Sequence, residues 1–189
     1  MRPAAIVAGI YVCPVMLLES GVIPFQLRFH VLLLMTLVAA ALSFTRHSAV
    51  NLGLTRPRLG PLAAWSVVPA ALLMGLVLLR DSGHRVATPG HTVFYLFFVF
   101  VSAPAQEFVY RSFLFAEMRA ARIPQSAIVF LSAGLFGFMH IIYRDFATVL
   151  LTLAAGLIWA VLFHSTRKTL IVALSHAAVG MAAIFSGIV

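Results

Sequence analysis

The chain is 189 residues long, 62% of its residues are hydrophobic and 10% are charged, and its mean hydropathy is +1.06. This composition excludes a water-soluble domain of that size and indicates a polytopic membrane protein. The apolar runs are continuous, which favours helices over the alternating strands of a barrel. The net charge of +8 comes from basic residues scattered at the ends of apolar runs. We interpret these basic residues as topology signals and as contacts with the lipid bilayer. Because they do not cluster on one face, we expect no nucleic-acid partner.

The expected fold class is all-α, a transmembrane bundle of about seven helices within a range of six to eight, forming one membrane domain over residues 1–189. In chain order the apolar segments run over 4–23, 30–45, 61–79, 91–117, 125–143, 146–164 and 170–188. No small-residue cleavage site follows the first segment, so we expect it to be a retained span. The stretch from Thr45 to Gly60 is expected to be an interfacial loop or short amphipathic helix. The segment 91–117 is too long for one simple crossing and is expected to tilt or to bend at Pro104.

The distribution of basic residues favours a cytoplasmic N-terminus. In that orientation the inner side holds Arg2, Arg46, Arg56, Arg58, Arg119, Arg122, Arg167 and Lys168, and the outer side holds Arg28, Arg80, Arg85 and Arg144. The larger group is then cytoplasmic, as the distribution of basic residues in membrane proteins requires. Seven spans starting from a cytoplasmic N-terminus place the C-terminus on the outer side.

Polar and charged residues interrupt the segment 91–117 at Gln106, Glu107 and Arg111. A charge at bilayer depth costs about 2.5–3.5 kcal/mol on insertion scales, so it persists mainly where it faces a protein interior. Glu107 and Arg111 are four residues apart and share a helix face, which favours an ion pair that can be a structural staple alone. Gln106 lies about 100° around the helix from Glu107. One of the two can therefore face a cavity while the other pairs with Arg111.

Two isolated histidines lie in other apolar segments. Phe136 and His140 share a helix face, so the phenyl ring can fix the orientation of the imidazole. Gly134 and Gly137 are expected to allow close approach by another helix. His140 or His176 taken alone is more often a satisfied interior histidine. Polar groups brought into lipid by three separate segments together indicate a site.

These segments resemble the signature motifs of the CPBP family of intramembrane proteases, which includes the type II CAAX prenyl endopeptidases and bacterial relatives. The family motifs E-E-x-x-x-R, F-x-x-x-H and H-x-x-x-N/D are similar to Gln106-Glu107-x-x-x-Arg111, Phe136-x-x-x-His140 and His176-x-x-x-Gly180. The loop from Leu52 to Pro57 and the basic turn at Arg167 and Lys168 are also family-like. The resemblance covers about residues 50–180.

The resemblance implies a glutamic-type endopeptidase whose site opens into the bilayer. Its substrate would be a membrane-anchored protein or peptide cleaved near the membrane face, for example at a C-terminal lipidated or sorting-anchor segment. In the family, the first Glu, here position 106, and the His140 equivalent activate a water. The His176 equivalent and the side chain at position 180 stabilise the oxyanion. Glu107 and Arg111 would then form the structural ion pair.

The resemblance also implies a multi-pass protein of a bacterial inner, or cytoplasmic, membrane. We expect no metal cofactor. A Glu–His–His set resembles zinc ligation, but the pattern H-E-x-x-H is absent from the sequence.

Two positions depart from the family pattern. Gln106 stands where Glu is expected, and an amide cannot take the proton from water; losing a general base typically lowers the rate by about 10²–10⁴-fold. Gly180 stands where Asn or Asp is expected, and losing one oxyanion donor lowers it by about 10²–10³-fold. The sequence as printed is therefore expected to be inactive or a poor protease. Three explanations stay open: an engineered inactivating change, a natural pseudoprotease, or Glu107 acting as the base with water filling the space at Gly180.

Two other classes of function remain as alternatives. A non-catalytic scaffold or immunity protein could hold a membrane segment in the same cavity without cutting it. A small transporter is suggested only by the intramembrane charge, because the sequence lacks paired broken helices in two related halves.

Overall fold

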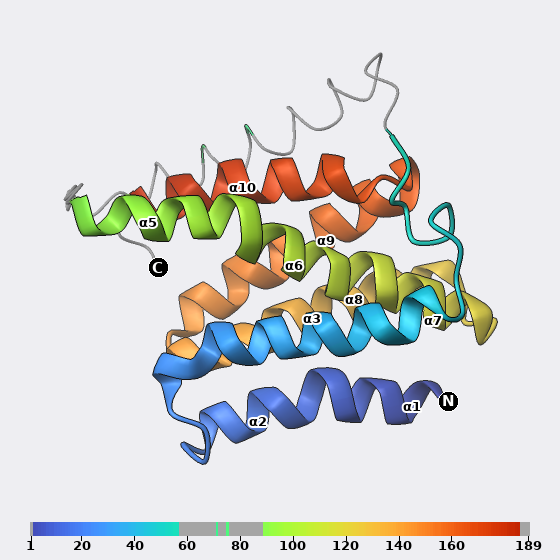
Figure 1. Cartoon of the computed structure of the whole chain (residues 1–189), viewed down its shortest axis with the longest axis horizontal. Coiled ribbons are helices and arrows are strands. Elements are labelled where there is room, and N and C mark those ends of the chain that lie inside the picture. Colours follow the sequence, from blue (N-terminus) through green and yellow to red (C-terminus); the bar gives the residue numbers. More distant parts are fainter. Residues whose placement is uncertain (1, 57–70, 72–74, 76–88, 186–189) are drawn as a thin grey trace.

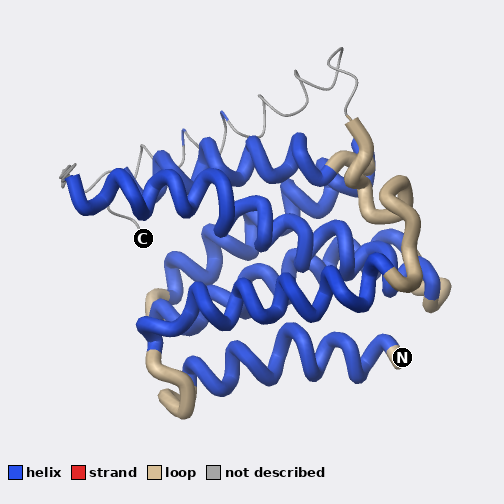
Figure 2. The backbone as a smooth tube through the Cα atoms, viewed as in Figure 1, coloured by secondary structure: helices blue, strands red, loops and turns tan. Residues whose placement is uncertain are grey.

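The computed structural model describes residues 2–56, 71, 75 and 89–185, and every regular element within those ranges is a helix. The longer helices lie side by side, and the chain runs back and forth between the two ends of the bundle (Figures 1 and 2). This confirms the all-α class. The expected span 61–79 lies outside the described residues except for positions 71 and 75, so the expected number of about seven helices stays a prediction.

In chain order the elements are α1 Pro3–Ile6, η1 Val7–Val12, α2 Cys13–Glu19, η2 Phe25–Leu27, α3 Arg28–Phe44, α5 Pro89–Phe97, η3 Phe98–Ser102, α6 Ala103–Glu107, η4 Phe108–Phe113, α7 Leu114–Ala120, α8 Gln125–Met139, η5 His140–Tyr143, α9 Phe146–Thr166 and α10 Thr169–Phe185. Of these, η1, η3 and η4 are π-helical turns, and η2 and η5 are 3-10 turns.

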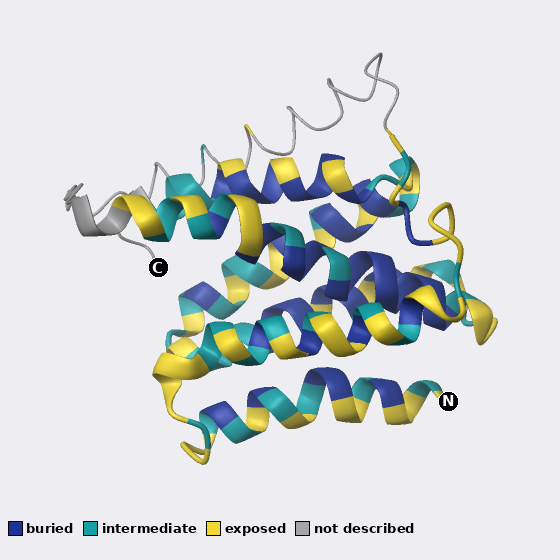
Figure 3. Ribbon diagram, viewed as in Figure 1, coloured by how far each residue is buried: buried dark blue, intermediate teal, exposed yellow. Residues whose placement is uncertain are grey.

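Four helical runs of the described part are long and apolar enough to cross a bilayer: Phe25–Phe44, Thr92–Ala120, Gln125–Tyr143 and Phe146–Thr166. Two further apolar helices, Pro3–Glu19 and Thr169–Ile184, are shorter. Large apolar residues such as Leu37 on α3 and Phe146 on α9 are exposed. Figure 3 shows exposed residues along the outer helices of the bundle. Such a surface suits contact with lipid, and together with the apolar helices it indicates a membrane protein.

The helix that carries Gln106 is interrupted by π turns on both sides of α6. Pro104 lacks an N–H and its ring crowds the preceding carbonyls, which accounts for the π turn η3 that ends just before it. Figure 1 shows the helix changing direction between α5 and α6, as the sequence led us to expect. In η4, the carbonyl oxygens of Val109 and Tyr110 accept hydrogen bonds from Tyr11 Oη at 2.7 Å and Ser132 Oγ at 2.8 Å. The second π turn is thus held by side chains from two other helices.

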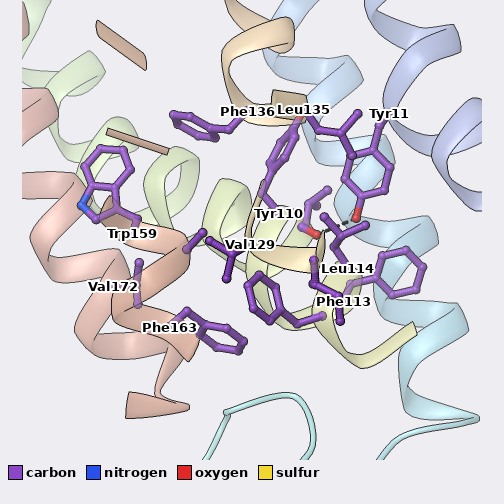
Figure 4. Packing of buried hydrophobic residues seen from close by; sticks show 14 of the residues in the cluster. Tyr11, Tyr110, Phe113, Leu114, Val129, Leu135, Phe136, Trp159, Phe163 and Val172 are labelled. Atoms are coloured by element: carbon purple, nitrogen blue, oxygen red, sulfur yellow. Dashed lines mark hydrogen bonds between the residues drawn. The ribbon is translucent and has the colours of Figure 1, made fainter. Parts of the chain in front are cut away.

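The core lies around η4 and α7, where every residue from Val109 to Met118 is buried. Aromatic rings connect this centre with the neighbouring helices (Figure 4). Tyr110 meets Tyr11 at a centroid distance of 5.3 Å and Phe136 at 5.5 Å, and Phe136 meets Trp159 at 5.7 Å, all edge to face. Such offset contacts add about 0.5–1.5 kcal/mol per pair beyond the area they bury.

Small residues bring α9 close to α8. A Cβ added at Gly137 would lie 3.0 Å from the Cβ of Leu153, so only glycine fits this contact without displacement. The same expectation for Gly134 is wrong, because no atom lies within 4 Å of a Cβ built there. The sequence pattern is alike at both positions, but only one of them faces α9.

The start of α10 is hydrogen-bonded to the loop that contains Leu52 and Gly53. Thr169 N donates to the carbonyl of Gly53 at 3.0 Å, and Thr169 Oγ1 donates to that of Leu52 at 3.0 Å. The hydroxyls of Ser112 and Thr169 lie 2.6 Å apart. Gly53 has a φ of +71°, and a Cβ there would lie 2.9 Å from the Phe163 ring. These contacts fix where α10 begins and hence where His176 lies.

We expect Tyr11→Phe to lower the free energy of unfolding by about 1–3 kcal/mol, because it leaves the buried carbonyl of Val109 without that donor. Denaturant unfolding in detergent micelles measures this change. The control is Ser165→Ala, which removes an exposed hydroxyl bonded to the carbonyl of Val161 in its own helix and should change stability by less than about 0.5 kcal/mol. Equal effects of the two substitutions would show that Tyr11 does not hold η4.

Candidate active site

One cavity of about 430 Å³ brings together three of the residues singled out in the sequence. Gln106 of α6, His140 of η5 and His176 of α10 all line it. Most of the remaining wall is aromatic or aliphatic, including Phe29, Phe94, Phe98, Phe136, Leu151 and Trp159. A few polar groups converging in a mostly apolar pocket are typical of a binding or catalytic site.

Glu107 and Arg111 lie behind this cavity, are fully buried and do not line it. Arg111 Nη1 donates to Glu107 Oε1 at 3.3 Å, and Arg111 Nε lies 3.2 Å from Glu107 Oε2. Arg111 Nη2 also donates to the carbonyl of Gly156 at 3.1 Å, and the guanidinium lies 4.5 Å from the centroid of the Phe136 ring. The predicted ion pair is therefore present, with Gln106 facing the cavity and its neighbour facing away.

His176 is oriented by Glu107. Its Nδ1 lies 2.7 Å from Glu107 Oε1, and because a carboxylate only accepts, this ring nitrogen carries a proton. Trp159 stacks on the imidazole at 4.3 Å with an interplanar angle of 20°, and Phe136 meets it edge to face at 5.6 Å. The ring is thus held by its hydrogen bond with Glu107 and by three aromatic contacts, the third of which is with Phe98. Its second nitrogen, Nε2, remains for a ligand.

His140 is oriented by its own helix. Its Nδ1 lies 2.8 Å from the carbonyl oxygen of Phe136, so Nδ1 is the donor and Nε2 of the neutral ring is an acceptor. The Phe136 ring lies 4.9 Å from the imidazole centroid. Phe136 therefore positions His140 through both its ring and its backbone carbonyl, of which the sequence pattern predicted only the ring.

Gln106 makes one side-chain hydrogen bond among those found for the described residues. Its Nε2 donates to Ser102 Oγ at 3.0 Å, while its buried Oε1 has no hydrogen-bond partner in the described part of the chain. A carboxylate in the same place could accept a hydrogen bond from the Ser102 hydroxyl. The surroundings of position 106 therefore suit a Glu as well as the Gln that is present.

Phe98 occupies the space beside Gly180. A Cβ added at Gly180 would lie 2.3 Å from Phe98 Cζ and 2.6 Å from Phe98 Cε1. The same ring meets His176 edge to face at 5.9 Å. One of the three open explanations placed water in the space left by Gly180, but the Phe98 ring occupies that space. An Asn or Asp at position 180 would require this ring to move.

Three residues of the site were missed by sequence reasoning: Ser102, Phe98 and Trp159. Ser102 precedes Gln106 by four residues and so shares its helix face, a signal that could have identified it. Trp159 is one of only two tryptophans in the chain. Phe98 is one of 16 phenylalanines, and nothing in the local sequence distinguishes it.

The contacts of the described site residues bear on whether these side chains could hold a metal ion. Among the described residues, no group of three His, Cys, Asp or Glu side chains is placed to hold an ion. The Glu107 carboxylate contacts Arg111 and His176, while His140 Nδ1 contacts a backbone carbonyl. This donor set does not fit the tetrahedral ligation that zinc requires.

We expect Glu107→Gln to lower the free energy of unfolding by about 3–5 kcal/mol, because it leaves the buried Arg111 charge uncompensated. Unfolding in detergent micelles measures the change. The matched control is Glu19→Gln, which breaks a pair with Arg144, whose side chain is 74% exposed, and should cost less than about 1 kcal/mol. A loss no larger than that of the control would argue against a stabilising role for the buried pair.

We expect Gly180→Ala to destabilise the protein by about 1–3 kcal/mol, because the new methyl group collides with the Phe98 ring. In a Phe98→Ala background the same substitution should have little effect. Gly134→Ala is the control, since it enters open space in α8 and should be neutral or stabilise by up to about 1 kcal/mol. Thermal melting of the four variants checks this coupling, and an unchanged effect of Gly180→Ala without the Phe98 ring would disprove it.

Comparison with known families agrees with these observations. The family described as type II CAAX prenyl endopeptidase Rce1-like matches residues 88–182. The match covers half of the chain and includes the three motif segments. No curated protein and no solved structure matches. The chain therefore belongs to the Rce1-like type II CAAX prenyl endopeptidase family, a family of membrane proteases, as the resemblance of its three motifs predicted.

Proposed function

We propose that this chain has the site of a glutamic-type intramembrane endopeptidase in which Gln106 stands at the position of the water-activating Glu, so that the sequence as printed cleaves poorly or not at all. The observation that carries the proposal is the convergence of Gln106, His140 and His176 from three separate helices on one largely apolar cavity. The substrate we propose is a membrane-anchored protein or peptide cleaved near the membrane face, at a C-terminal lipidated or sorting-anchor segment. This substrate class follows from the family.

Position 106 is the proposed place of the general base. A Glu there would take a proton from the water that attacks the scissile carbonyl, with the Ser102 hydroxyl hydrogen-bonded to its second oxygen. His140 Nε2, which is an acceptor because Nδ1 donates to the Phe136 carbonyl, would orient the water or share its proton.

His176 is the proposed oxyanion donor, and its contact with Glu107 sets a condition on that role. Because Nδ1 holds a proton toward Glu107 Oε1, Nε2 donates a hydrogen bond only when the ring is an imidazolium. Glu107 orients this ring as the aspartate orients the histidine in a Ser-His-Asp triad. The Nε2–H group would then donate a hydrogen bond to the negatively charged oxygen of the tetrahedral intermediate.

Glu107 itself fits the role of a positioning residue better than that of a base. It does not line the cavity, and its two oxygens face Arg111 and His176. Acting as the base would require Glu107 to release these partners. This supports position 106 as the site of the base over the alternative in which Glu107 replaces it.

We place the N-terminus on the cytoplasmic side of a bacterial inner membrane. The basic residues Arg46, Arg119, Arg122, Arg167 and Lys168 follow the ends of α3, α7 and α9 or lie within α7, at the same end of the bundle as the N-terminus (Figure 1). The cavity is lined by residues near the start of α3, the end of α8 and the start of α9, and these lie at the other end. In this orientation the cavity lies toward the outer side.

The second candidate function is a non-catalytic protein, a pseudoprotease, scaffold or immunity protein, that holds a membrane segment in the same cavity. Two observations favour it. Gln106 offers an amide where catalysis requires a carboxylate, and Phe98 fills the space of the motif side chain at position 180. Such a site keeps its shape for binding while lacking two groups that catalysis uses.

We expect that only the Gln106→Glu variant cleaves membrane-anchored C-terminal segments, at a rate at least about 10²-fold above the printed sequence. The measurement compares both proteins in liposomes against a library of such segments. Gln125→Glu is the matched control, because it makes the same change on α8 outside the cavity. When combined with Gln106→Glu, the substitutions His140→Ala and His176→Ala should each abolish cleavage while the protein remains folded and extractable.

Other outcomes of this assay distinguish the alternatives. Equal cleavage by both proteins would make Glu107 the base and reverse the roles of positions 106 and 107. Retention of an uncut segment by both proteins, without cleavage by either, would support the binding-protein function.

A further inference from the structure

We propose that Arg28, at the edge of the cavity where α3 begins, forms an anion-binding subsite for the C-terminal carboxylate of a peptide whose apolar side chains lie in the cavity. The inference rests on the proposed function only in placing a peptide there, and it does not require that the peptide is cut.

Arg28 brings a permanent positive charge to a wall that has no acid. Among the described residues that line the cavity, none is Asp or Glu, and Arg28 is the one Arg or Lys. The acids near this end are engaged elsewhere. Glu19 lies 3.3 Å from Arg144 Nε, and Asp145 caps α9 by accepting from the backbone N–H of Thr148 at 2.9 Å. The effective dielectric constant is lower beside an apolar pocket than in water. A guanidinium in that position therefore attracts a carboxylate more strongly than a fully solvated guanidinium does.

The guanidinium of Arg28 is held in place before any ligand arrives. It lies 4.2 Å from the centroid of the Phe25 ring and 4.6 Å from that of Phe29. Nη1 donates to the carbonyl of Phe25 at 3.3 Å, while Nε is buried and has no acceptor among the described residues. Cation–π contacts with two rings restrict the side chain, so less conformational freedom is lost when a carboxylate binds. The planar fork of an arginine suits a carboxylate with two oxygens.

Ring contacts connect Arg28 with the proposed catalytic residues. Phe25 meets Tyr143 at 5.7 Å, and Tyr143 stacks with His140 at 5.8 Å. Arg28, Gln106 and His140 also line a second, smaller pocket of about 50 Å³. An extended peptide advances about 3.3–3.6 Å per residue. A carboxylate at Arg28 therefore lets a peptide only a few residues long reach His140.

A lipid headgroup is the other source of an anion at this end of the bundle. Arg144 is the residue that suits a headgroup, because its side chain is 74% exposed. Arg28 lines the cavity and has a buried Nε between two phenyl rings. Its position favours a ligand that enters the cavity over one that stays on the outer surface.

The test measures binding by the printed sequence, which keeps the peptide intact if Gln106 blocks cleavage. The probes are two fluorescein-labelled hexapeptides of leucine, phenylalanine and alanine that differ only in a C-terminal carboxylate or amide. Fluorescence anisotropy in phosphatidylcholine nanodiscs, with empty nanodiscs subtracted, gives the two dissociation constants. We expect the acid to bind about tenfold more tightly than the amide. Arg28→Gln should abolish this preference, Arg28→Lys should keep part of it, and Arg144→Gln should leave it unchanged.

Several results would overturn the inference: equal affinity of the two peptides, no binding of either, or a preference that survives in Arg28→Gln. An affinity that follows the content of anionic phosphatidylglycerol in the nanodisc and not the peptide terminus would assign Arg28 to a headgroup instead. Melting temperatures of the Arg28 variants show whether they fold. If the acid preference depends on Arg28 while Gln106→Glu cuts nothing, only the proposed protease function fails. If Gln106→Glu cuts but Arg28→Gln keeps the preference, only the subsite fails.

Discussion

The buried ion pair between Glu107 and Arg111 is the constraint on which the arrangement of the other helices depends. A charge inside a bilayer is stable only where its partners surround it, and here those partners come from different helices. Arg111 donates a hydrogen bond to the carbonyl of Gly156 on α9 and lies over the Phe136 ring on α8. Glu107 is hydrogen-bonded to the imidazole of His176 on α10. The contacts that compensate the charges also set where these helices meet.

The same ion pair also determines, through the geometry of one helix, which way the side chain of Gln106 points. Because consecutive residues differ by about 100° around an α-helix, holding Glu107 toward Arg111 turns Gln106 toward the cavity. Glu107 then contacts Arg111 through both of its oxygens and His176 through Oε1, while no cation lies against the side chain of residue 106 among the contacts of the described residues. Adjacent residues of similar size thus have different surroundings, and the identity of residue 106 decides whether a carboxylate lines the cavity.

Local spacing in the sequence predicted two of the contacts in the site that lie within one helix, although the contact between Ser102 and Gln106 was missed. The pairs Glu107–Arg111 and Phe136–His140 are each four residues apart, and helix geometry alone brings them together. Contacts between helices were not predictable in this way. The stacking of Trp159 on His176 and the Phe98 ring beside Gly180 depend on how α9, α10 and η3 pack, and no local pattern encodes that packing. Gly134 and Gly137 illustrate the same limit, since only the second meets another helix.

The π turns on either side of α6 have a consequence for how this site can diversify. Each π turn accommodates one residue more than an α-helical turn would. Removing one residue from η3 would rotate α5 by about 100° relative to α6, turning Phe94 and its neighbours away from the cavity wall without changing any motif residue. Variation in chain length by a single residue is therefore a route to a differently shaped pocket, separate from any substitution within it.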